Sequence, residues 1–379
     1  MSPTPVTWSL PTQPMSYSWE ATDEEVAARY GLPVESILRF DLNTSPAPPE
    51  IAAEVLRAGT FEMPLSEYPP SDYRRLIEAA ARTYGVTPDE LLVGAGADEI
   101  LDLIGKAFLP AGGRAVVPVP TYAMYRVITE QRAASADLVP RLGPSEGYAL
   151  DLGATRAAAG SADVVWLCSP NNPTGLPEPG NAIEILLDEI AADAVASGRP
   201  PAIVVLDEAY AEFVGRSMLN LRLRHPNLVV VRTASKAYGL AGLRVGFAIA
   251  QPATIARIAV YRPPGSVSTV SVSVVTAALE DPRGMVANVE RVDAERDRLA
   301  ADLRAAGWSV GPSVTNFLLV DFGAAERAAE VATAMLQRGL VPRTFGEGHP
   351  LAHCLRLTIR DRAGNERLAA AAREIEEAP

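Results

Sequence analysis

The residues best suited to do chemistry gather between Thr233 and Arg244, in the stretch Thr-Ala-Ser-Lys-Ala-Tyr-Gly-Leu-Ala-Gly-Leu-Arg. The chain has 34 lysines and arginines, yet only two are lysines, Lys106 and Lys236. A lysine amine can add to a carbonyl, whereas an arginine stays protonated near neutral pH and cannot. Lys236, beside hydroxyls and an arginine, therefore predicts Schiff-base chemistry. Lys106 lies in the amphipathic run 100–108, where a surface lysine is expected.

A second polar group follows the apolar run 203–206. Asp207 comes directly after this run, and Tyr210 follows three residues later. A buried carboxylate can keep the nitrogen of a pyridine ring protonated, and a tyrosine hydroxyl can donate to a phenolate oxygen on that ring. The alternatives are a helix N-cap for Asp207 and a core position for Tyr210.

Two further motifs could contact the same ring. Asn172 lies in Ser-Pro-Asn-Asn-Pro-Thr-Gly, where proline and glycine make a rigid turn that could aim its amide at the ring oxygen. Tyr122 follows Pro120-Thr and could stack on the ring face. Taken alone, Asn172 is an ordinary turn residue and Tyr122 an ordinary packing residue. Their assignment to the ring therefore depends on the other motifs.

A phosphate needs amide donors, hydroxyls and a cation. The segment Gly96-Ala97-Asp98 opens an expected helix, whose first N–H groups attract anions. Thr233, Ser235 and Arg244 offer hydroxyls and charge. The pattern is neither a Walker motif nor a dinucleotide fingerprint, because the third glycine is missing at the required spacing.

The elements that must position these residues alternate from about 90 to 250. Near-continuous apolar strands followed by helices predict an α/β fold with a mostly parallel sheet covered on both faces. The carboxyl ends of such strands converge on one crevice, and every polar motif above lies at such an end. A helix over 71–84, capped by Ser71 and Asp72, is expected before this region.

The pattern changes after residue 265. A long helical region over 269–306 is expected to break at Asp281-Pro282, and short strands and one helix follow it. This predicts a smaller α+β domain joined to the large one by the long helix. The expected division is an N-terminal arm with the first part of the small domain (1–60), a large cofactor-binding domain (61–264) and a small C-terminal domain (265–379).

Composition excludes several classes of protein. The net charge of −12 argues against a nucleic-acid surface, and two cysteines give no disulfide framework. The three histidines show no metal-ligand spacing, so no metal is predicted. The sequence has neither a membrane-length apolar run nor the features of a secretory signal, so a cytoplasmic protein is expected.

Together and in this order, the motifs resemble the fold-type I pyridoxal-phosphate enzymes, specifically the class I and II aminotransferases. The chain is most similar to the histidinol-phosphate aminotransferase family of histidine biosynthesis, from about Leu42 to Leu368. The resemblance implies a seven-stranded sheet in the large domain, pyridoxal 5'-phosphate (PLP) as cofactor, and ping-pong transfer of an amino group from a small-molecule donor to a 2-oxo acid. It also implies a homodimer.

The resemblance assigns roles residue by residue. It implies that Lys236 holds PLP as a Schiff base and later carries the α-proton, with Asp207 on the ring nitrogen and Tyr122 over the ring. Asn172 and Tyr210 would contact the ring oxygen. The implied phosphate contacts are Ala97, Asp98, Thr233, Ser235 and Arg244 of the same chain and Tyr68 reaching over from the neighbouring subunit. Arg356 matches the arginine that binds the substrate α-carboxylate, and Arg343 matches one that contacts the phosphate of histidinol phosphate.

Three departures from the family leave the substrate open. The family segment Asn-Glu-Asn-Pro-Tyr-Gly is here Asn43-Thr-Ser-Pro-Ala-Pro, a family tyrosine is replaced by 263–266, and a glycine is Arg360. Histidinol phosphate with 2-oxoglutarate is the first hypothesis. An aminotransferase for aromatic or other amino acids is an alternative, as is an enzyme similar to threonine-phosphate decarboxylase. A cofactor-sensing transcription regulator is disfavoured because residues 1–40 are not a basic DNA-binding domain.

Overall fold

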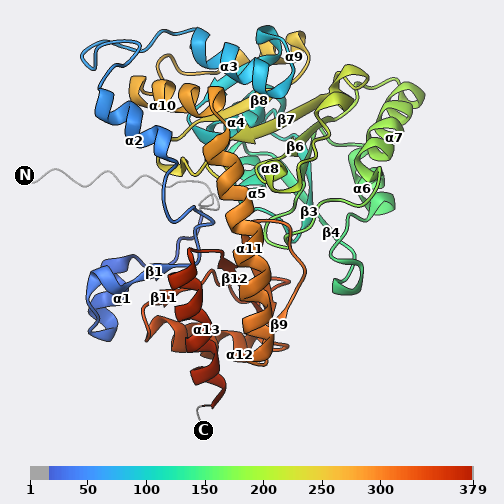
Figure 1. Cartoon of the computed structure of the whole chain (residues 1–379). Helices are drawn as coiled ribbons and strands as arrows, with labels where there is room; N and C mark the ends of the chain where they lie inside the picture. Colours follow the sequence, from blue (N-terminus) through green and yellow to red (C-terminus); the bar gives the residue numbers. More distant parts are fainter. Residues whose placement is uncertain (1–16, 378–379) are drawn as a thin grey trace, which may run out of the picture.

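A seven-stranded sheet forms the centre of the larger part of the molecule in the computed structural model, which describes residues 17–377 (Figure 1). Its strands are β2 (Leu91–Gly94), β3 (Arg114–Val119), β4 (Ser135–Pro140), β5 (Val164–Cys168), β6 (Ile203–Asp207), β7 (Leu228–Thr233) and β8 (Gly246–Ile249).

The strand order is β2-β8-β7-β6-β5-β3-β4. The neighbours from β7 to β4 pair in parallel, and only β8 runs antiparallel to the strands beside it. The predicted α/β fold with a mostly parallel seven-stranded sheet is therefore confirmed. Strand β4 was not among the predicted strands, because this edge strand is polar and half exposed and lacks an apolar run.

Helices bury both faces of this sheet. Along β6, Val204 and Leu206 face one hydrophobic core while Val205 faces another, as the alternation of side chains in a strand requires. For this reason, the sequence of a strand that is buried on both faces is a continuous apolar run. The surrounding helices are α3 (Arg74–Tyr84), α4 (Gly96–Phe108), α5 (Met124–Gln131), α6 (Leu152–Ala159), α7 (Ala182–Ser197), α8 (Ala211–Val214) and α9 (Pro252–Ala259).

The second lobe has its own core beneath a small sheet. Strands β9 (Ser309–Val310), β10 (Phe317–Asp321) and β12 (Cys354–Thr358) pair antiparallel in the order β12-β10-β9. Strands β1 (Leu38–Arg39) and β11 (Leu340–Val341) form a parallel pair. The helices of this lobe are α1 (Asp23–Tyr30), α12 (Ala325–Leu336) and α13 (Arg362–Glu377).

Helix α11 (Arg283–Ala305) runs from one lobe to the other (Figure 1). The predicted break before it is confirmed, since α10 (Thr269–Glu280) ends just before Asp281-Pro282. The proline ring cannot continue an α-helix from the preceding turn. Short 3-10 turns occupy Val34–Ser36, Pro88–Glu90, Pro144–Glu146, Leu219–Leu223 and Ala241–Leu243.

The predicted start of α3 was wrong. The helix begins at Arg74 rather than Ser71, and its N-cap is Tyr73, with φ of 46° and no side-chain cap. Tyr73 is fully buried, and its hydroxyl accepts a hydrogen bond from the Val267 N–H at 3.1 Å. Packing of this ring therefore holds a backbone conformation that a capping pattern does not predict.

The domain limits at 60/61 and 264/265 stay a proposal. Helices α2 (Glu50–Ala58) and α10 pack against each other, and both contribute to the core that lies on the large sheet. Residues 1–16 of the expected arm lie outside the described residues. Among the helices of residues 17–377, none combines the length and apolar character needed to cross a bilayer.

Strand β8 and the start of α4 approach so closely that a side chain has no room between them. A Cβ on Gly246 would lie 2.5 Å from the Gly96 carbonyl carbon and 2.6 Å from the Ala97 nitrogen. Both are backbone atoms, so the strand or the helix would have to move.

We predict that Gly246→Ala lowers the free energy of unfolding by about 1–3 kcal/mol, the usual cost of overpacking. Urea and thermal unfolding would measure the loss. Gly242→Ala is the matched control, because a Cβ at Gly242 meets nothing within 4 Å. Equal stability of the two variants would contradict the predicted clash.

Candidate active site

Residues from several strands meet at one edge of the large sheet. Asp207 ends β6 and Thr233 ends β7, while Asn172 and Tyr122 follow β5 and β3. These are the carboxyl ends of parallel strands, where ligand crevices of open α/β sheets form. The predicted convergence of the motifs is what this topology produces.

Lys236 lies just beyond the end of β7 and is partly buried. Its Nζ donates a hydrogen bond to the Asn43 carbonyl at 3.3 Å and lies 5.8 Å from the centre of the Tyr210 ring. Burial, followed by the nearby charge of Arg356, lowers the pKa of Lys236 to about 8. Near neutral pH, Lys236 is therefore present as the free amine more often than a lysine with an ordinary pKa is.

Asp207 is buried with both carboxylate oxygens engaged. The Tyr125 hydroxyl donates to Oδ2 at 2.8 Å, and the Ala209 N–H donates to Oδ1 at 3.0 Å. Burial raises the pKa of Asp207 to about 6, and these two hydrogen bonds oppose the rise. The carboxylate is thus held rigidly, and it favours a cationic partner that would relieve its burial.

Tyr125 was missed by sequence reasoning. Its ring stacks on Trp166 with centroids 5.7 Å apart, and it meets Tyr122 edge to face at the same distance. Tyr122 precedes α5 and Tyr125 lies in its first turn, so no helical spacing in the sequence linked the two rings.

Asn43 was also missed as a site residue, although it begins one of the segments that depart from the family. Its Nδ2 donates to the Tyr210 hydroxyl at 3.0 Å, and its carbonyl accepts from Lys236 and from Asn316 Nδ2, the latter at 2.9 Å. Its backbone N–H donates to Thr358 Oγ1 at 2.9 Å, and its φ is 53°. Asparagine tolerates this left-handed conformation better than most residues.

Arg356 reaches from the small sheet to the large one. Its Nη1 donates to Asn172 Oδ1 at 2.6 Å, and its Nη2 donates to the Asp41 carbonyl. The side chain is buried, and its Nε has no hydrogen-bond partner among residues 17–377. A buried guanidinium with an unused N–H group is suited to receive a carboxylate.

The start of α4 forms an anion cradle together with the segment after β7. Asp98 accepts from the Tyr122 hydroxyl at 2.9 Å and from Arg244 Nη2 at 3.1 Å. A Cβ on Gly96 would lie 2.5 Å from Arg244 Nη2, and the φ of Gly96 is +85°, a backbone conformation that favours glycine. Arg244 itself is half exposed, and its charge is open to an incoming anion.

The hydroxyls of this cradle support each other. Thr233 Oγ1 donates to Ser235 Oγ at 2.9 Å, and the Ser235 N–H donates to Thr233 Oγ1 at 3.1 Å. Both residues are buried beside Lys236 in the chain. Ala97 follows Gly96 in the first turn of α4, where its N–H belongs to the group that helix bonding leaves free.

Arg343 lies beside Arg356 on a neighbouring backbone segment, since the two residues exchange N–H···O bonds of 3.0 and 3.1 Å. Its guanidinium contacts the N-terminal arm, with Nη1 donating to the Ser18 carbonyl at 2.7 Å. It also lies 5.2 Å from the centre of the Tyr17 ring. Neither this contact nor Tyr17 itself had a signal in the sequence.

Two residues lie outside this cluster. Tyr68 is 89% exposed, and within the described residues no hydrogen bond joins it to the other candidates. Arg360, which stands where the family has a glycine, donates its backbone N–H to Asn365 Oδ1 at 2.9 Å, and its carbonyl accepts from Arg291. Its alkyl stem approaches Gly364 at the start of α13.

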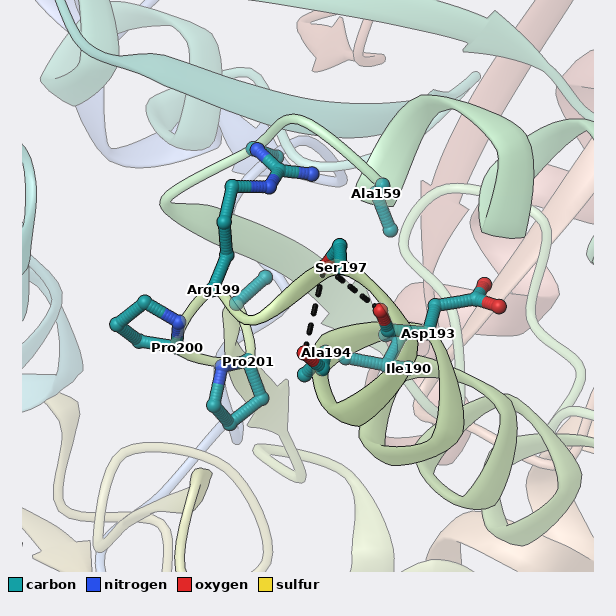
Figure 2. A pocket seen from close by; sticks show the side chains of 11 residues that line it. Ala159, Ile190, Asp193, Ala194, Ser197, Arg199, Pro200 and Pro201 are labelled. Carbon is teal, nitrogen blue, oxygen red and sulfur yellow. Dashed lines mark hydrogen bonds between the residues drawn. The ribbon is translucent and has the colours of Figure 1, made fainter.

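A pocket at the ends of α6 and α7 is separate from this crevice (Figure 2). Its Ser197 hydroxyl donates to the Asp193 carbonyl at 2.7 Å and to the Ala194 carbonyl at 3.3 Å. None of the candidate residues lines it. The pocket is a depression between helix ends rather than part of the reactive crevice.

Asp321, His353 and Cys354 bring one potential ligand atom each within 4.8 Å of one another. Sequence spacing did not connect Asp321 with this group, because Asp321 ends β10, whereas His353 and Cys354 lie at the start of β12. Burial raises the pKa of the Cys354 thiol to about 12, so the thiol stays protonated near neutral pH.

Comparison with known proteins identifies the family. Residues 36–371 match the model for aminotransferase class I and II. The chain is 36% identical over 360 residues to the histidinol-phosphate aminotransferase of Roseiflexus castenholzii, covering 93% of each chain. It is 35% identical over 355 residues to that of Symbiobacterium thermophilum, covering 92% of each.

A solved structure agrees. The histidinol-phosphate aminotransferase of Sinorhizobium meliloti, in complex with pyridoxal-5'-phosphate, superposes with a TM-score of 0.83 at 27% identity and covers 95% of both chains. The family model and these relatives show that the chain belongs to the class I and II aminotransferase family.

Proposed function

We propose that this aminotransferase moves the amino group of histidinol phosphate to 2-oxoglutarate with PLP as its cofactor. The meeting of Lys236, Asp207 and Arg356 in one crevice carries the proposal, because together they offer an amine, a buried acid and a carboxylate receptor. The names of the similar proteins supply the substrate.

The residues present fit PLP. Asp207 is buried and hydrogen-bonded in a way that favours a protonated ring nitrogen as its partner. The cradle of Gly96, Arg244 and the paired hydroxyls fits a phosphate. Tyr122, whose hydroxyl is fixed by Asp98, would lie over the ring face. Ala97, Asp98, Thr233, Ser235 and Arg244 would surround the phosphate, and Asn172 and Tyr210 would donate to the ring oxygen.

Bound PLP supplies an aldehyde that condenses with amines and a pyridine ring that takes up electrons from the α carbon. The chain's own groups do the rest. Asp207 Oδ holds the proton on the ring nitrogen, while Lys236 Nζ takes the proton from the α carbon of the donor and later returns one. A lysine pKa of about 8 suits this work, since the amine is then readily both protonated and deprotonated near neutral pH.

Two substrates use one site in turn. Histidinol phosphate carries a phosphate and no carboxylate, so Arg343 would bind its anionic end. 2-Oxoglutarate carries an α-carboxylate, which the Arg356 guanidinium would receive. Neighbouring arginines on paired backbone segments thus serve the two half-reactions of a ping-pong cycle.

A homodimer is part of the proposal. Tyr68 is almost fully exposed and would reach the PLP phosphate of the neighbouring subunit. Sedimentation equilibrium should give twice the chain mass of 40.2 kDa. A monomer that retains full activity would rule out a role for Tyr68 across subunits.

The two lysines of the chain allow a matched test of the chemistry. Lys236→Ala should reduce turnover at least about 10³-fold, because both the attachment point and the base are removed. Borohydride treatment with PLP followed by mass spectrometry should label position 236 in the wild-type protein and nothing in the variant. Lys106→Ala, which removes an exposed amine paired with Asp102, should keep both properties. Labelling of Lys236→Ala would overturn the assignment.

Arg343 tests the substrate. Arg343→Ala should lower kcat/KM for histidinol phosphate by roughly 10²-fold, since a charge-assisted contact to phosphate is lost, while histidinol should change far less. Steady-state rates with both donors would measure the difference. Equal losses would remove Arg343 from the phosphate role, and release of CO2 from phosphothreonine would favour a decarboxylase instead.

A further inference from the structure

We propose that Glu20 is a specificity-determining residue whose carboxylate competes with the anionic end of the amino donor for Arg343. The inference rests on the proposed function, in which Arg343 receives the donor phosphate. It adds an opposing charge on the N-terminal arm that the family resemblance did not suggest.

Glu20 is held against the strand segment that carries Arg343. Its Oε1 accepts from the Thr344 N–H and from Thr344 Oγ1, both at 2.8 Å, and lies 3.6 Å from Arg343 Nη1. The Arg343 and Glu20 side chains are only 16% and 18% exposed. Water therefore screens this ion pair less than it would a surface pair.

The arm that carries Glu20 lies over the reactive crevice. Tyr17 contacts the Arg343 guanidinium, and its ring centre is 6.3 Å from that of Tyr122, the residue expected over the cofactor ring. On its other side the arm is tied down by Arg39 Nη1, which donates to the Ala21 carbonyl. Tyr17 thus lies between the proposed phosphate receptor and the ring site.

Residues of the N-terminal arm already contact the Arg343 guanidinium. Nη1 donates to Ser18 O and faces the Glu20 carboxylate. His349 adds no cation here, because burial and then the charge of Arg343 lower its pKa, which leaves the ring neutral near pH 7. An arriving phosphate must therefore displace Glu20 or accept repulsion from it.

The consequence is a weaker preference for a dianionic donor than Arg343 alone would give. An uncharged donor end neither gains from Arg343 nor is repelled by Glu20. The charge of Glu20 therefore sets the ratio of kcat/KM for a phosphorylated donor to that for its unphosphorylated counterpart.

Glu20→Gln tests the charge alone, because the amide oxygen can still accept from Thr344. With the holoenzyme, kcat/KM for histidinol phosphate should rise roughly tenfold, as expected for removal of one like charge at a partly buried site. The value for histidinol should stay within about twofold. Glu24→Gln is the matched control, since it removes the same charge from an exposed position four residues further along.

A second variant separates charge from anchoring. Thr344→Val removes one hydrogen bond to Glu20 and keeps its charge, so it should raise kcat/KM for histidinol phosphate less than Glu20→Gln does. If Glu20→Gln changes both donors equally, or changes neither, the competition does not exist and the proposal is overturned.

Inorganic phosphate distinguishes failure of this proposal from failure of the proposed function. Whatever the donor, phosphate should inhibit Glu20→Gln at roughly tenfold lower concentration than the wild type. Arg343→Ala should abolish this gain when combined with Glu20→Gln. Unchanged inhibition would overturn the role of Glu20, whereas inactivity toward histidinol phosphate with the expected shift in inhibition would overturn only the donor.

Discussion

A carboxylate buried at the end of a central strand is the constraint on which the site depends. Asp207 lies where β6 leaves the sheet, between β5 and β7, and no water-exposed surface stabilises its charge. A buried carboxylate is costly unless it is hydrogen-bonded or paired with a cation. Tyr125 and Ala209 satisfy its oxygens, and stacking on Trp166 fixes Tyr125 in turn. In the proposed function, the protonated ring nitrogen of PLP would pair with this carboxylate.

Burial also shifts the pKa of Lys236, but it lowers this pKa whereas it raises that of Asp207. Low solvation disfavours its ammonium form, and Arg356 and Arg244 disfavour it further. Burial therefore favours the protonated form of Asp207 and also increases the fraction of Lys236 that is present as the free amine. Both pKa shifts arise from burial at the same edge of the sheet.

Assembly of the site requires both lobes. Asp207, Asn172 and Lys236 come from the large sheet, whereas Arg356 comes from β12 in the small lobe. Asn43 joins them, because it contacts Tyr210 and Lys236 on one side and Thr358 on the other. The N-terminal arm then lies across the junction through Arg343.

Much of this architecture follows from local patterns in the sequence. Apolar runs of strand length, each followed by a polar motif, indicate a parallel sheet with its functional residues at one edge, because alternating faces are both buried. The rarity of lysine singles out Lys236, and Pro282 marks the helix break. The Schiff-base chemistry proposed for Lys236 rests on its amine, which can lose its proton near neutral pH, whereas an arginine cannot.

Other features depend on long-range contacts, for which a linear sequence carries no signal. Asn43 and Tyr210 are far apart in the chain, as are Glu20 and Thr344, and their hydrogen bonds exist only because the two lobes and the arm are folded against each other. Tyr73 likewise starts α3 through the packing of its ring rather than through a cap. Side-chain type and local periodicity therefore determined the elements and the reactive groups, whereas tertiary packing alone decided which charges face each other, because electrostatic interactions depend on distance in space.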